Sequence, residues 1–423
     1  MAMDRRRRFG RVRSGVLIAL VVALTLGWEA GAPKAEAGEA TPGATPGQVA
    51  AGPGSLASLL ARIPDVLSMP GTPKFDIATY ADIGGQLAAV GVAAPSDPDD
   101  PAAEEWSRAT VGLTIPSPLR EQGLNPVWAD TFGFGALDLD QALTIGEPPS
   151  QTTLMRGRFD VAAVRDAWRR NGYRAREIDG VTIASRPEGA GSDLSTDVGR
   201  LTLGAFDQMA FLDDETLVAA RTADAVAAVL AVAAGTRPSL AERAEIAALL
   251  RTAPPDLASA AIVSGAALRG SDAAALLEGG TEPAQANALA TRIATDIAER
   301  EAMPPVRFVL IGVTAGGPVA LPRDADGPTP TPPPAATPEA QIAIRVLFAD
   351  RAAAEAATPL VGRRLADGTS ALTQQPYAGF FPDPRLTVAA SEPVLALDLR
   401  AEGRPQAVIW QMLYARDLGF LAW

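Results

Sequence analysis

The same order of predicted elements occurs twice, about 190 residues apart, and this limits the folds open to the chain. In the first copy, a strand at 152–159 precedes Asp160, which can cap a helix at 161–170. Strands at 173–178 and 181–185 then flank Asp179-Gly180, a two-residue hairpin signal. In the second copy, a strand at 341–349 precedes Asp350 and a helix at 351–366. We therefore predict a β-α-β-β unit in each half.

Further elements follow the same local rules. Strands at 208–212 and 216–220 flank the turn Asp213-Asp214-Glu215, and Thr222 can cap an Ala-rich helix. Ser239 precedes a helix whose Leu240, Ala244 and Ala247 would share one face. The remaining predicted elements are strands at 74–80, 258–265, 304–315, 385–390 and 394–399, and helices at 82–91, 138–146 and 405–418.

These elements predict an α+β fold made of two related lobes. Each lobe would be an antiparallel sheet with helices on one face, in the split β-α-β arrangement of ferredoxin-like folds. The predicted N-terminal lobe spans 55–303 with a helical extension, and the C-terminal lobe spans 304–423. A Pro-rich segment at 316–338 has the composition of a long exposed loop within the second lobe.

The N-terminal segment predicts export. Six arginines precede Gly15–Trp28, an apolar run of 14 residues. That run is shorter than the roughly 18 to 20 residues that span a bilayer and has the length of a signal-peptide core. Ala35 and Ala37 form the A-x-A pattern that signal peptidase recognises. Residues 1–37 are therefore expected to be a signal peptide, or an anchor in the inner membrane through 15–28 if cleavage fails.

The export route stays open. The sequence RRRF at 6–9 resembles the twin-arginine signal that exports folded proteins, but Arg5 and Gly10 stand where that signal has other residues.

The segment after the predicted signal peptide, 38–54, is rich in Gly, Pro and Thr and predicts a flexible tether. The expected location of the rest of the chain is extracytoplasmic, either secreted or membrane-anchored.

Charge argues against nucleic acid as a partner. The whole chain carries a net charge of −12, and residues 38–423 hold 30 basic and 46 acidic residues, a net charge of −16. A protein of that sign repels phosphate backbones. We therefore read the N-terminal arginines as the cytoplasmic end of the export signal.

The residue inventory removes many kinds of chemistry. The chain has no His and no Cys, which excludes Ser-His-Asp and Cys-His catalysis, His-ligated metal sites, thiolate sites and Fe–S clusters. Neither of the two lysines, Lys34 and Lys74, lies in a phosphate-binding P-loop, and no glycine pattern completes the dinucleotide-binding motif. We expect no cofactor and assign no catalytic, cofactor-binding or metal residue.

Carboxylates remain as candidates. Asp138 and Asp140 would share a face in a strand, but the sequence at 138–143 favours a capped helix start. The run Asp213 to Glu215 is typical of a solvated turn. Two acidic stretches, 96–105 and 323–327, offer oxygens to calcium but lack the EF-hand spacing.

Three functions stay open. The first is a non-catalytic exported protein that binds a ligand or an envelope partner. The second is a carboxylate-dependent hydrolase of extracellular polymers, which needs two facing carboxyl groups. The third is a structural subunit of an envelope assembly. The apolar end of the chain, 417–423, is expected to pack on the C-terminal lobe.

Overall fold

The computed structural model describes most of the chain from Ser55 onward. The described residues are 55–65, 77–89, 118–122, 125–146, 150–178, 180–187, 193–269, 303–314, 340–370, 373–401, 405–414 and 417–421, with scattered positions from 92 to 115. The described residues all belong to one compact unit, Val49–Trp423. The predicted signal, the tether and the loop at 316–338 lie outside the described residues.

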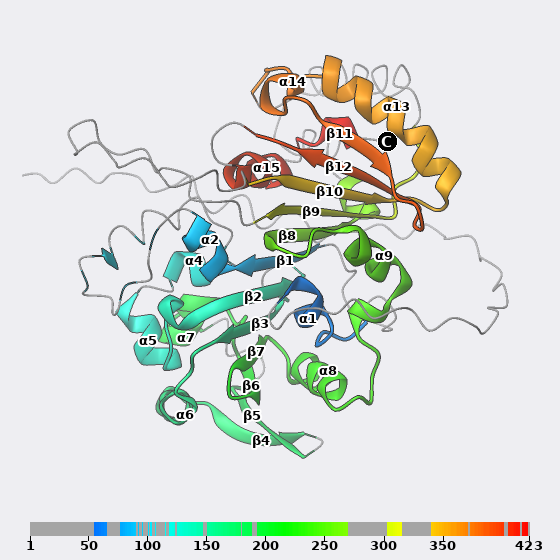
Figure 1. The fold of residues 1–423 in the computed structure, drawn as a ribbon. Helices are drawn as coiled ribbons and strands as arrows, with labels where there is room; N and C mark the ends of the chain where they lie inside the picture. The colour runs from blue at the N-terminus through cyan, green and yellow to red at the C-terminus, as the bar shows by residue number, and fades with distance from the viewer. Residues whose placement is uncertain are drawn as a thin grey trace, which may run out of the picture. The chain divides into compact units, whose positions relative to one another are not determined.

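Twelve strands form one antiparallel sheet (Figure 1). Its order is β11-β12-β10-β9-β8-β1-β2-β3-β7-β6-β5-β4. The first seven strands along the chain are β1 (Ile77–Asp82), β2 (Leu139–Ile145), β3 (Thr152–Gly157), β4 (Arg174–Ile178), β5 (Val181–Ser185), β6 (Gln208–Asp213) and β7 (Thr216–Ala220). The last five are β8 (Leu257–Ser264), β9 (Phe308–Thr314), β10 (Ile342–Leu347), β11 (Arg385–Val388) and β12 (Val394–Leu399).

Helices connect these strands. Those before β8 are α1 (Leu56–Leu60), α2 (Ile83–Ala89), α4 (Leu119–Gln122), α5 (Pro126–Phe132), α6 (Val161–Arg170), α7 (Asp197–Thr202), α8 (Ala223–Ala233) and α9 (Ala244–Thr252). Those after β8 are α10 (Gly265–Arg269), α13 (Arg351–Asp367), α14 (Tyr377–Phe380) and α15 (Pro405–Tyr414). The described residues also form the 3-10 turns η2 (Ala136–Asp138), η4 (Leu240–Glu242) and η5 (Gly419–Leu421). The α+β class predicted from the sequence is confirmed.

Several local predictions are confirmed by atomic contacts. Asp160 Oδ1 accepts a hydrogen bond from the Ala163 N–H at 3.0 Å, and Asp350 Oδ1 accepts one from the Ala353 N–H at 2.8 Å, so both cap their helices. Thr222 caps α8 in the same way. The β4–β5 hairpin turns at positions 179–180, with Gly180 at φ +80°. That left-handed angle is the one a two-residue hairpin favours.

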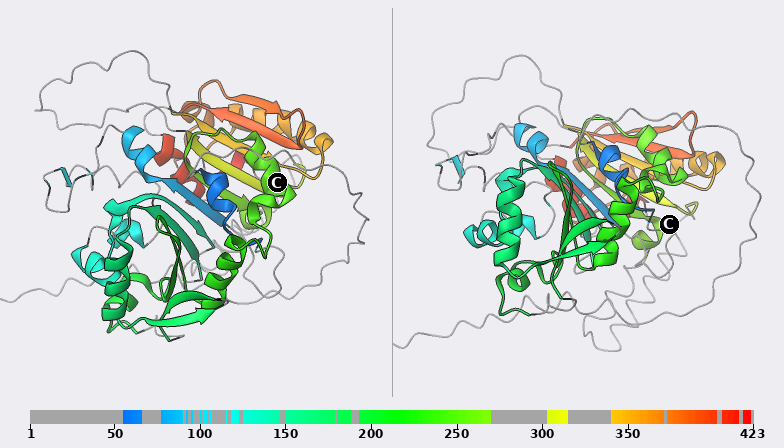
Figure 2. Two further views of the ribbon diagram at one scale, coloured as in Figure 1. Left: turned by 60° about the horizontal axis from the view of Figure 1, so that its bottom comes forward. Right: turned by 90° about the horizontal axis from the view of Figure 1, so that it is seen from below.

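Both faces of the sheet carry helices, so the prediction of helices on one face is wrong. α6 packs in a core with β2, β3 and β7, whereas α8 packs in a different core on the other face of the same strands. Figures 1 and 2 show the two helices on opposite sides of the sheet. The physical reason lies in strands such as β7 and β8, whose residues are all buried and therefore need cover on both faces.

Two other predictions differ from the structure. Residues 139–145 form strand β2 instead of a helix, because β1 and β3 hydrogen-bond to it on both sides. The helix predicted after Ser239 is broken at Arg243, whose ψ of 129° is extended. The break changes the helical phase, so Ile246, Ala248 and Leu249 form the buried face of α9.

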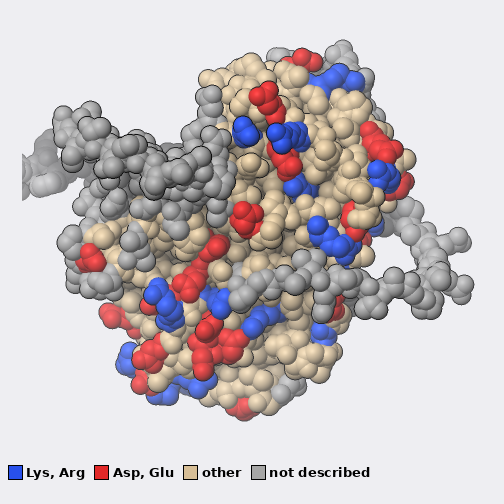
Figure 3. All heavy atoms as spheres, in the orientation of Figure 1, with Lys and Arg blue, Asp and Glu red and all other residues tan. Residues whose placement is uncertain are grey.

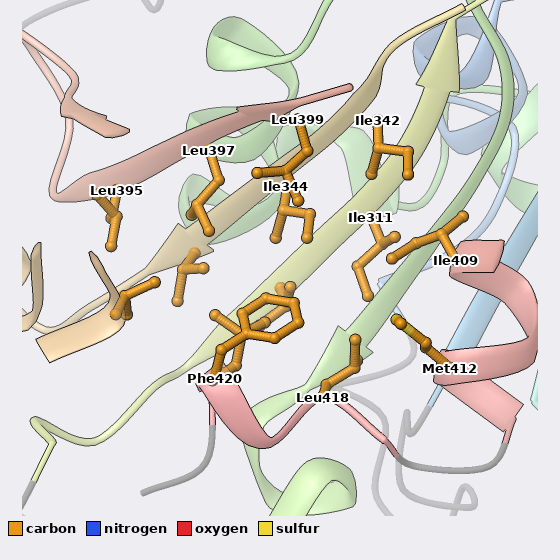
Figure 4. Close-up of a cluster of buried hydrophobic side chains, with 14 of the residues drawn as sticks. Ile311, Ile342, Ile344, Leu395, Leu397, Leu399, Ile409, Met412, Leu418 and Phe420 are labelled. Atoms are coloured by element: carbon orange, nitrogen blue, oxygen red, sulfur yellow. The ribbon is translucent and has the colours of Figure 1, made fainter. Parts of the chain in front are cut away.

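The C-terminal segment packs as predicted. Leu418, Phe420 and Leu421 are buried in a core built on strands β8 to β12 together with α13 and α15. Figure 4 shows Phe420 and Leu418 directed toward the strands. The carboxylate of Asp417, itself buried, accepts hydrogen bonds from Ser370 Oγ at 2.5 Å and from the Tyr377 hydroxyl at 2.9 Å. These contacts hold the end of the described chain on the sheet.

Candidate functional site

A charged hollow of about 390 Å³ lies between α1 and the β6–β7 turn. Its volume is in the range of small-molecule sites. The lining side chains come from α1 and the residues after it, from β3 and from the β6–β7 hairpin, and they are Ser58, Leu59, Arg62, Arg156, Asp213, Asp214, Glu215 and Thr216. The turn residues occupy the place that the sequence predicts, because β6 ends at Asp213 and β7 begins at Thr216.

Two ion pairs cross the hollow. Arg62 Nη1 lies 2.6 Å from Asp213 Oδ2, which links the end of α1 to the end of β6. Arg156 Nη2 on β3 lies 2.8 Å from Glu215 Oε2. Both pairs are partly exposed, so each contributes little to stability by itself. Their effect is to fix the positions of the two guanidinium groups and two of the carboxylates.

Asp213 is held in its ionised form. Partial burial acts to raise its pKa, but hydrogen bonds from Arg62 and Thr216, the Arg62 charge and the Glu215 N–H together lower the pKa below its usual value. A carboxyl with a lowered pKa cannot hold a proton near neutral pH. Asp213 is therefore unsuited to general-acid catalysis and suited to binding a cation.

Asp214 is the carboxylate of the hollow that neither Arg62 nor Arg156 pairs with. Its side chain is exposed and forms neither a hydrogen bond nor an ion pair with any described residue. The lining holds two arginines and three carboxylates, so its formal charge is −1. A ligand with an ammonium or guanidinium group would complete this balance.

Sequence reasoning found the acidic turn but not the hollow. Arg62 and Asp213 are 151 positions apart, and Arg156 and Glu215 are 59 positions apart. No local pattern connects residues at such separations. Only the pairing of β3 with β7 brings Arg156 and Glu215 together.

A second pair of carboxylates lies where β1 and β2 meet. Asp82 ends β1 and Asp140 lies near the start of β2. Burial raises the pKa of Asp82, the Gly85 N–H acts to lower it, and the Asp140 charge raises it further. A carboxyl with a raised pKa beside a second carboxyl is the combination that acid-base catalysis uses.

Local geometry holds Asp82 in place. Its Oδ1 accepts a hydrogen bond from the Gly85 N–H at 2.9 Å at the start of α2. A Cβ atom on residue 85 would lie 2.5 Å from Asp82 Oδ2, so glycine is needed there for the carboxyl to keep its position. The sequence placed Asp82 at the start of a helix but gave no sign of its closeness to Asp140.

Asp138 does not face Asp140. Its Oδ2 accepts a hydrogen bond from the Gly135 N–H at 2.7 Å, within the 3-10 turn that precedes β2. Asp140 Oδ1 instead lies 3.8 Å from Arg158 Nε, and both side chains are largely exposed. The structure thus separates the pair suggested by the sequence and brings Asp140 near Asp82.

The other candidates give no site among the described residues. No group of three His, Cys, Asp or Glu side chains there can hold a metal ion. In the acidic stretch at 96–105, Asp100 Oδ1 accepts a hydrogen bond from the Ala102 N–H at 2.9 Å, as expected of a cap. The stretch at 323–327 and the signal-peptidase residues Ala35 and Ala37 lie outside the described residues.

The described tryptophans belong to the core. Trp106, Trp128, Trp168 and Trp410 are all buried. Carbohydrate-binding platforms use exposed aromatic faces, and these four side chains offer none.

Comparisons with known proteins assign no family. No protein-family model and no curated protein match the chain. Three crystal structures of TP0453 resemble it weakly, in crystal forms III, IV and I. Their TM-scores are 0.32, 0.31 and 0.30 at 10%, 9% and 10% identity, and each alignment covers 82% of this chain and 98%, 96% and 98% of the other. A likeness of this size establishes neither fold nor function.

Within the described part of the chain, no helix combines the length and apolar character needed to cross a membrane.

Proposed function

We propose that this chain is an exported, non-catalytic protein that binds a ligand carrying a cationic group. The observation that supports the proposal is the hollow beside the β6–β7 turn. There, Arg62 and Arg156 hold two carboxylates in fixed positions, and the Asp214 carboxylate has no partner. A cationic group would be bound by Asp214, with the fixed carboxylates adding attraction.

The lowered pKa of Asp213 favours binding over catalysis. A hydrolase of the two-carboxyl type needs one carboxyl that keeps its proton. Hydrogen bonds and the Arg62 charge oppose that at Asp213. The hollow thus has the electrostatics of a cation receptor.

A thermal-shift screen tests the proposal. The purified chain is heated with spermidine, calcium, oligosaccharides, lipids or nucleotides. A ligand at about a hundred times its dissociation constant adds roughly 2.7 kcal/mol of stability. We expect spermidine, a flexible trivalent amine, to raise the melting temperature. We also expect Asp214→Asn to remove that shift, whereas Asp256→Asn, at another exposed turn, preserves it.

Two results would contradict the proposal. A spermidine shift that is equal in wild type and Asp214→Asn would place amine binding elsewhere. The absence of any amine shift in the wild-type chain would remove the ligand class.

Export is part of the proposal and has its own test. It rests on the arginines before Gly15–Trp28 and on the A-x-A pattern at Ala35 and Ala37. Mass spectrometry of the protein from fractionated cells should find an extracytoplasmic chain that begins at Gly38. An intact N-terminus in the membrane fraction would show an uncleaved anchor, and an intact chain in the cytoplasm would contradict export.

Asp82 and Asp140 favour a second function, hydrolysis of an extracellular polymer. Asp82 would be the general acid, because burial and the Asp140 charge raise its pKa. Dye-labelled polysaccharides and peptidoglycan are suitable substrates. Activity lost in both Asp82→Asn and Asp140→Asn, and kept in Asp138→Asn, would establish this function in place of the first.

We also propose that the two halves arose by duplication. From the centre of the sheet outward, the strands of the first half lie in the order β1-β2-β3-β7-β6, and those of the second half in the order β8-β9-β10-β12-β11. In each half the first three strands follow the chain, and the last two are in reversed order. Asp160 and Asp350 cap the helices after β3 and β10. Likewise, Ser264 Oγ accepts from the Ala267 N–H at 3.2 Å after β8, as Asp82 does after β1.

This relationship starts the second half at β8, not at residue 304. Superposition of the halves in an experimental structure should place β8 on β1 and β10 on β3 in register. A consistent shift of one residue between them would contradict duplication, because it would reverse the face of every side chain.

A further inference from the structure

Among the described residues, strand β4 forms an open edge of the sheet. It pairs with β5 on one side and ends the strand order on the other. Residues Arg174 to Glu177 are all exposed, and only Ile178 is partly buried. An open edge of this kind offers backbone N–H and C=O groups to another strand.

The hairpin that carries this edge is anchored but projects beyond its neighbour. β5 pairs with β6 at two positions, Ala184 with Met209 and Ser185 with Gln208. Ile183 is fully buried in the core that contains α8. The β4–β5 hairpin is therefore fixed at its base.

Register identifies the backbone groups that point outward. Ile178 and Val181 flank the two-residue turn and pair with each other across it. In a hairpin of this type these two residues share the turn's hydrogen bond. Because inward and outward groups alternate along an antiparallel strand, the N–H and C=O groups of Ala175 and Glu177 point away from β5.

The edge is basic in an otherwise acidic protein. Strand β4 carries two arginines and one glutamate, and the preceding helix α6 adds three arginines and one aspartate, whereas the whole chain has a net charge of −12. Arg169 pairs with Asp166, and Arg165 lies over the Phe211 ring. Arg174 and Arg176 are exposed and form no ion pair with any residue that the structure describes. They lie two residues apart and so share one face of the strand.

This charge disfavours pairing of β4 with a second copy of itself. If two β4 strands paired antiparallel about a twofold axis at Ala175, Arg174 of one chain would lie opposite Arg176 of the other. With the axis at Arg176, the Arg176 side chains of the two chains would lie opposite each other. Like charges directly opposite each other destabilise a strand pair. An acidic strand would instead be attracted.

We propose that the β4 edge binds an extended acidic segment of a partner protein, which adds to the sheet as a further strand. The partner's backbone would hydrogen-bond to Ala175 and Glu177. Acidic side chains two residues apart would lie opposite Arg174 and Arg176. Such strand addition gains affinity from the backbone and specificity from alternate side chains.

The opposite edge of the sheet provides a matched control. β11 also begins with an exposed arginine, Arg385, but α13 packs on this strand. If any exposed arginine on an edge strand were enough to attract an acidic peptide, substitution of Arg385 would also weaken binding.

Fluorescence polarisation with a labelled peptide tests the proposal. The probe is acetyl-TDVDVDT-amide, and TVDDDVT is the control with equal charge but no alternation. We expect the control peptide, the double variant R174Q/R176Q and the variant A175P each to weaken binding by about tenfold or more, a factor that corresponds to 1.4 kcal/mol. R385Q should leave the affinity unchanged.

Proline at 175 removes an outward N–H without breaking the pairing with β5. Hydrogen exchange on the wild-type chain supplies a test that needs no variant. The probe should protect the amides of Ala175 and Glu177.

Three results would overturn the proposal. One is the absence of probe binding at low salt. Another is equal affinity for the two peptides, which would show charge attraction alone. The third is binding without protection of the Ala175 and Glu177 amides.

Discussion

Removal of the Phe420 side chain tests whether the end of the chain is part of the core. Phe420 is fully buried, and its ring packs edge-on against Tyr377, with 5.1 Å between ring centroids, and against Phe381 at 6.1 Å. Substitution of a buried Phe by Ala costs about 3 to 5 kcal/mol, from lost burial and the cavity that remains. Phe420→Ala should therefore be strongly destabilising.

The expected change in melting temperature follows from the size of the folded unit. Val49–Trp423 contains 375 residues. At about 2.1 cal/mol/K per residue, the entropy of unfolding is roughly 0.8 kcal/mol/K. A loss of about 4 kcal/mol then lowers the melting temperature by about 5 °C if the unit unfolds in one step.

Differential scanning calorimetry measures this change, and Phe380→Ala is the control. Phe380 is only partly buried at the margin of the same core, so its removal should lower the melting temperature by less than half as much. A change below about 1 °C for Phe420→Ala would refute the packing of the C-terminal segment.

Three further substitutions test buried and titrating groups. In the wild-type chain, Arg186 Nη1 lies 3.3 Å from Asp207 Oδ1, and both side chains are buried. Asp207→Ala leaves the Arg186 guanidinium without a counter-charge, so it should lower the free energy of unfolding, measured with denaturant, by about 3 to 5 kcal/mol. Asp417→Asn removes charge from a carboxylate that accepts two hydroxyl hydrogen bonds and should cost about 1 to 3 kcal/mol, with no loss contradicting its role. The pKa of Asp82 is raised in the folded chain, so the folded protein keeps this proton at a higher pH than the unfolded chain does. The free energy of unfolding therefore falls as the pH rises toward and through the folded-state pKa of Asp82. Asp82→Asn should remove that loss, and a variant less stable than wild type at pH 7 by chemical denaturation would contradict the assignment.

The parts of the fold that were predicted from the sequence depend on local chemistry. Asp160, Thr222 and Asp350 cap their helices through atoms three residues away, and Gly180 takes the left-handed conformation in the turn between Ile178 and Val181. Such signals lie within a few positions of each other. They were sufficient to place most strands and helices.

The parts that were missed depend on distant contacts. The sequence at Asp138–Gln141 resembles a helix start, but hydrogen bonds from β1 and β3 on both sides make it a strand. β1 and β8 are about 180 positions apart, and their pairing, together with that of β8 with β9, places strands of both predicted lobes in one sheet. The hollow depends on the same kind of contact, because Arg62 reaches Asp213 across 151 positions.

Surface charge also depends on the fold. Figure 3 shows acidic and basic side chains interspersed on one face of the molecule. The net charge of −12 therefore does not describe each region. The basic β4 edge and the acidic hollow differ in sign, and each is suited to a partner of the opposite sign.

Isothermal titration calorimetry of spermidine into the wild-type chain and Asp214→Asn tests the binding function most directly. We predict one site in the wild-type chain and an affinity about tenfold lower or worse in the variant, because the unpartnered carboxylate of the hollow supplies the attraction. Affinity should also fall as salt increases. Equal affinities in the two proteins, or no heat of binding in either, would contradict the assignment of the hollow as a cation-binding site.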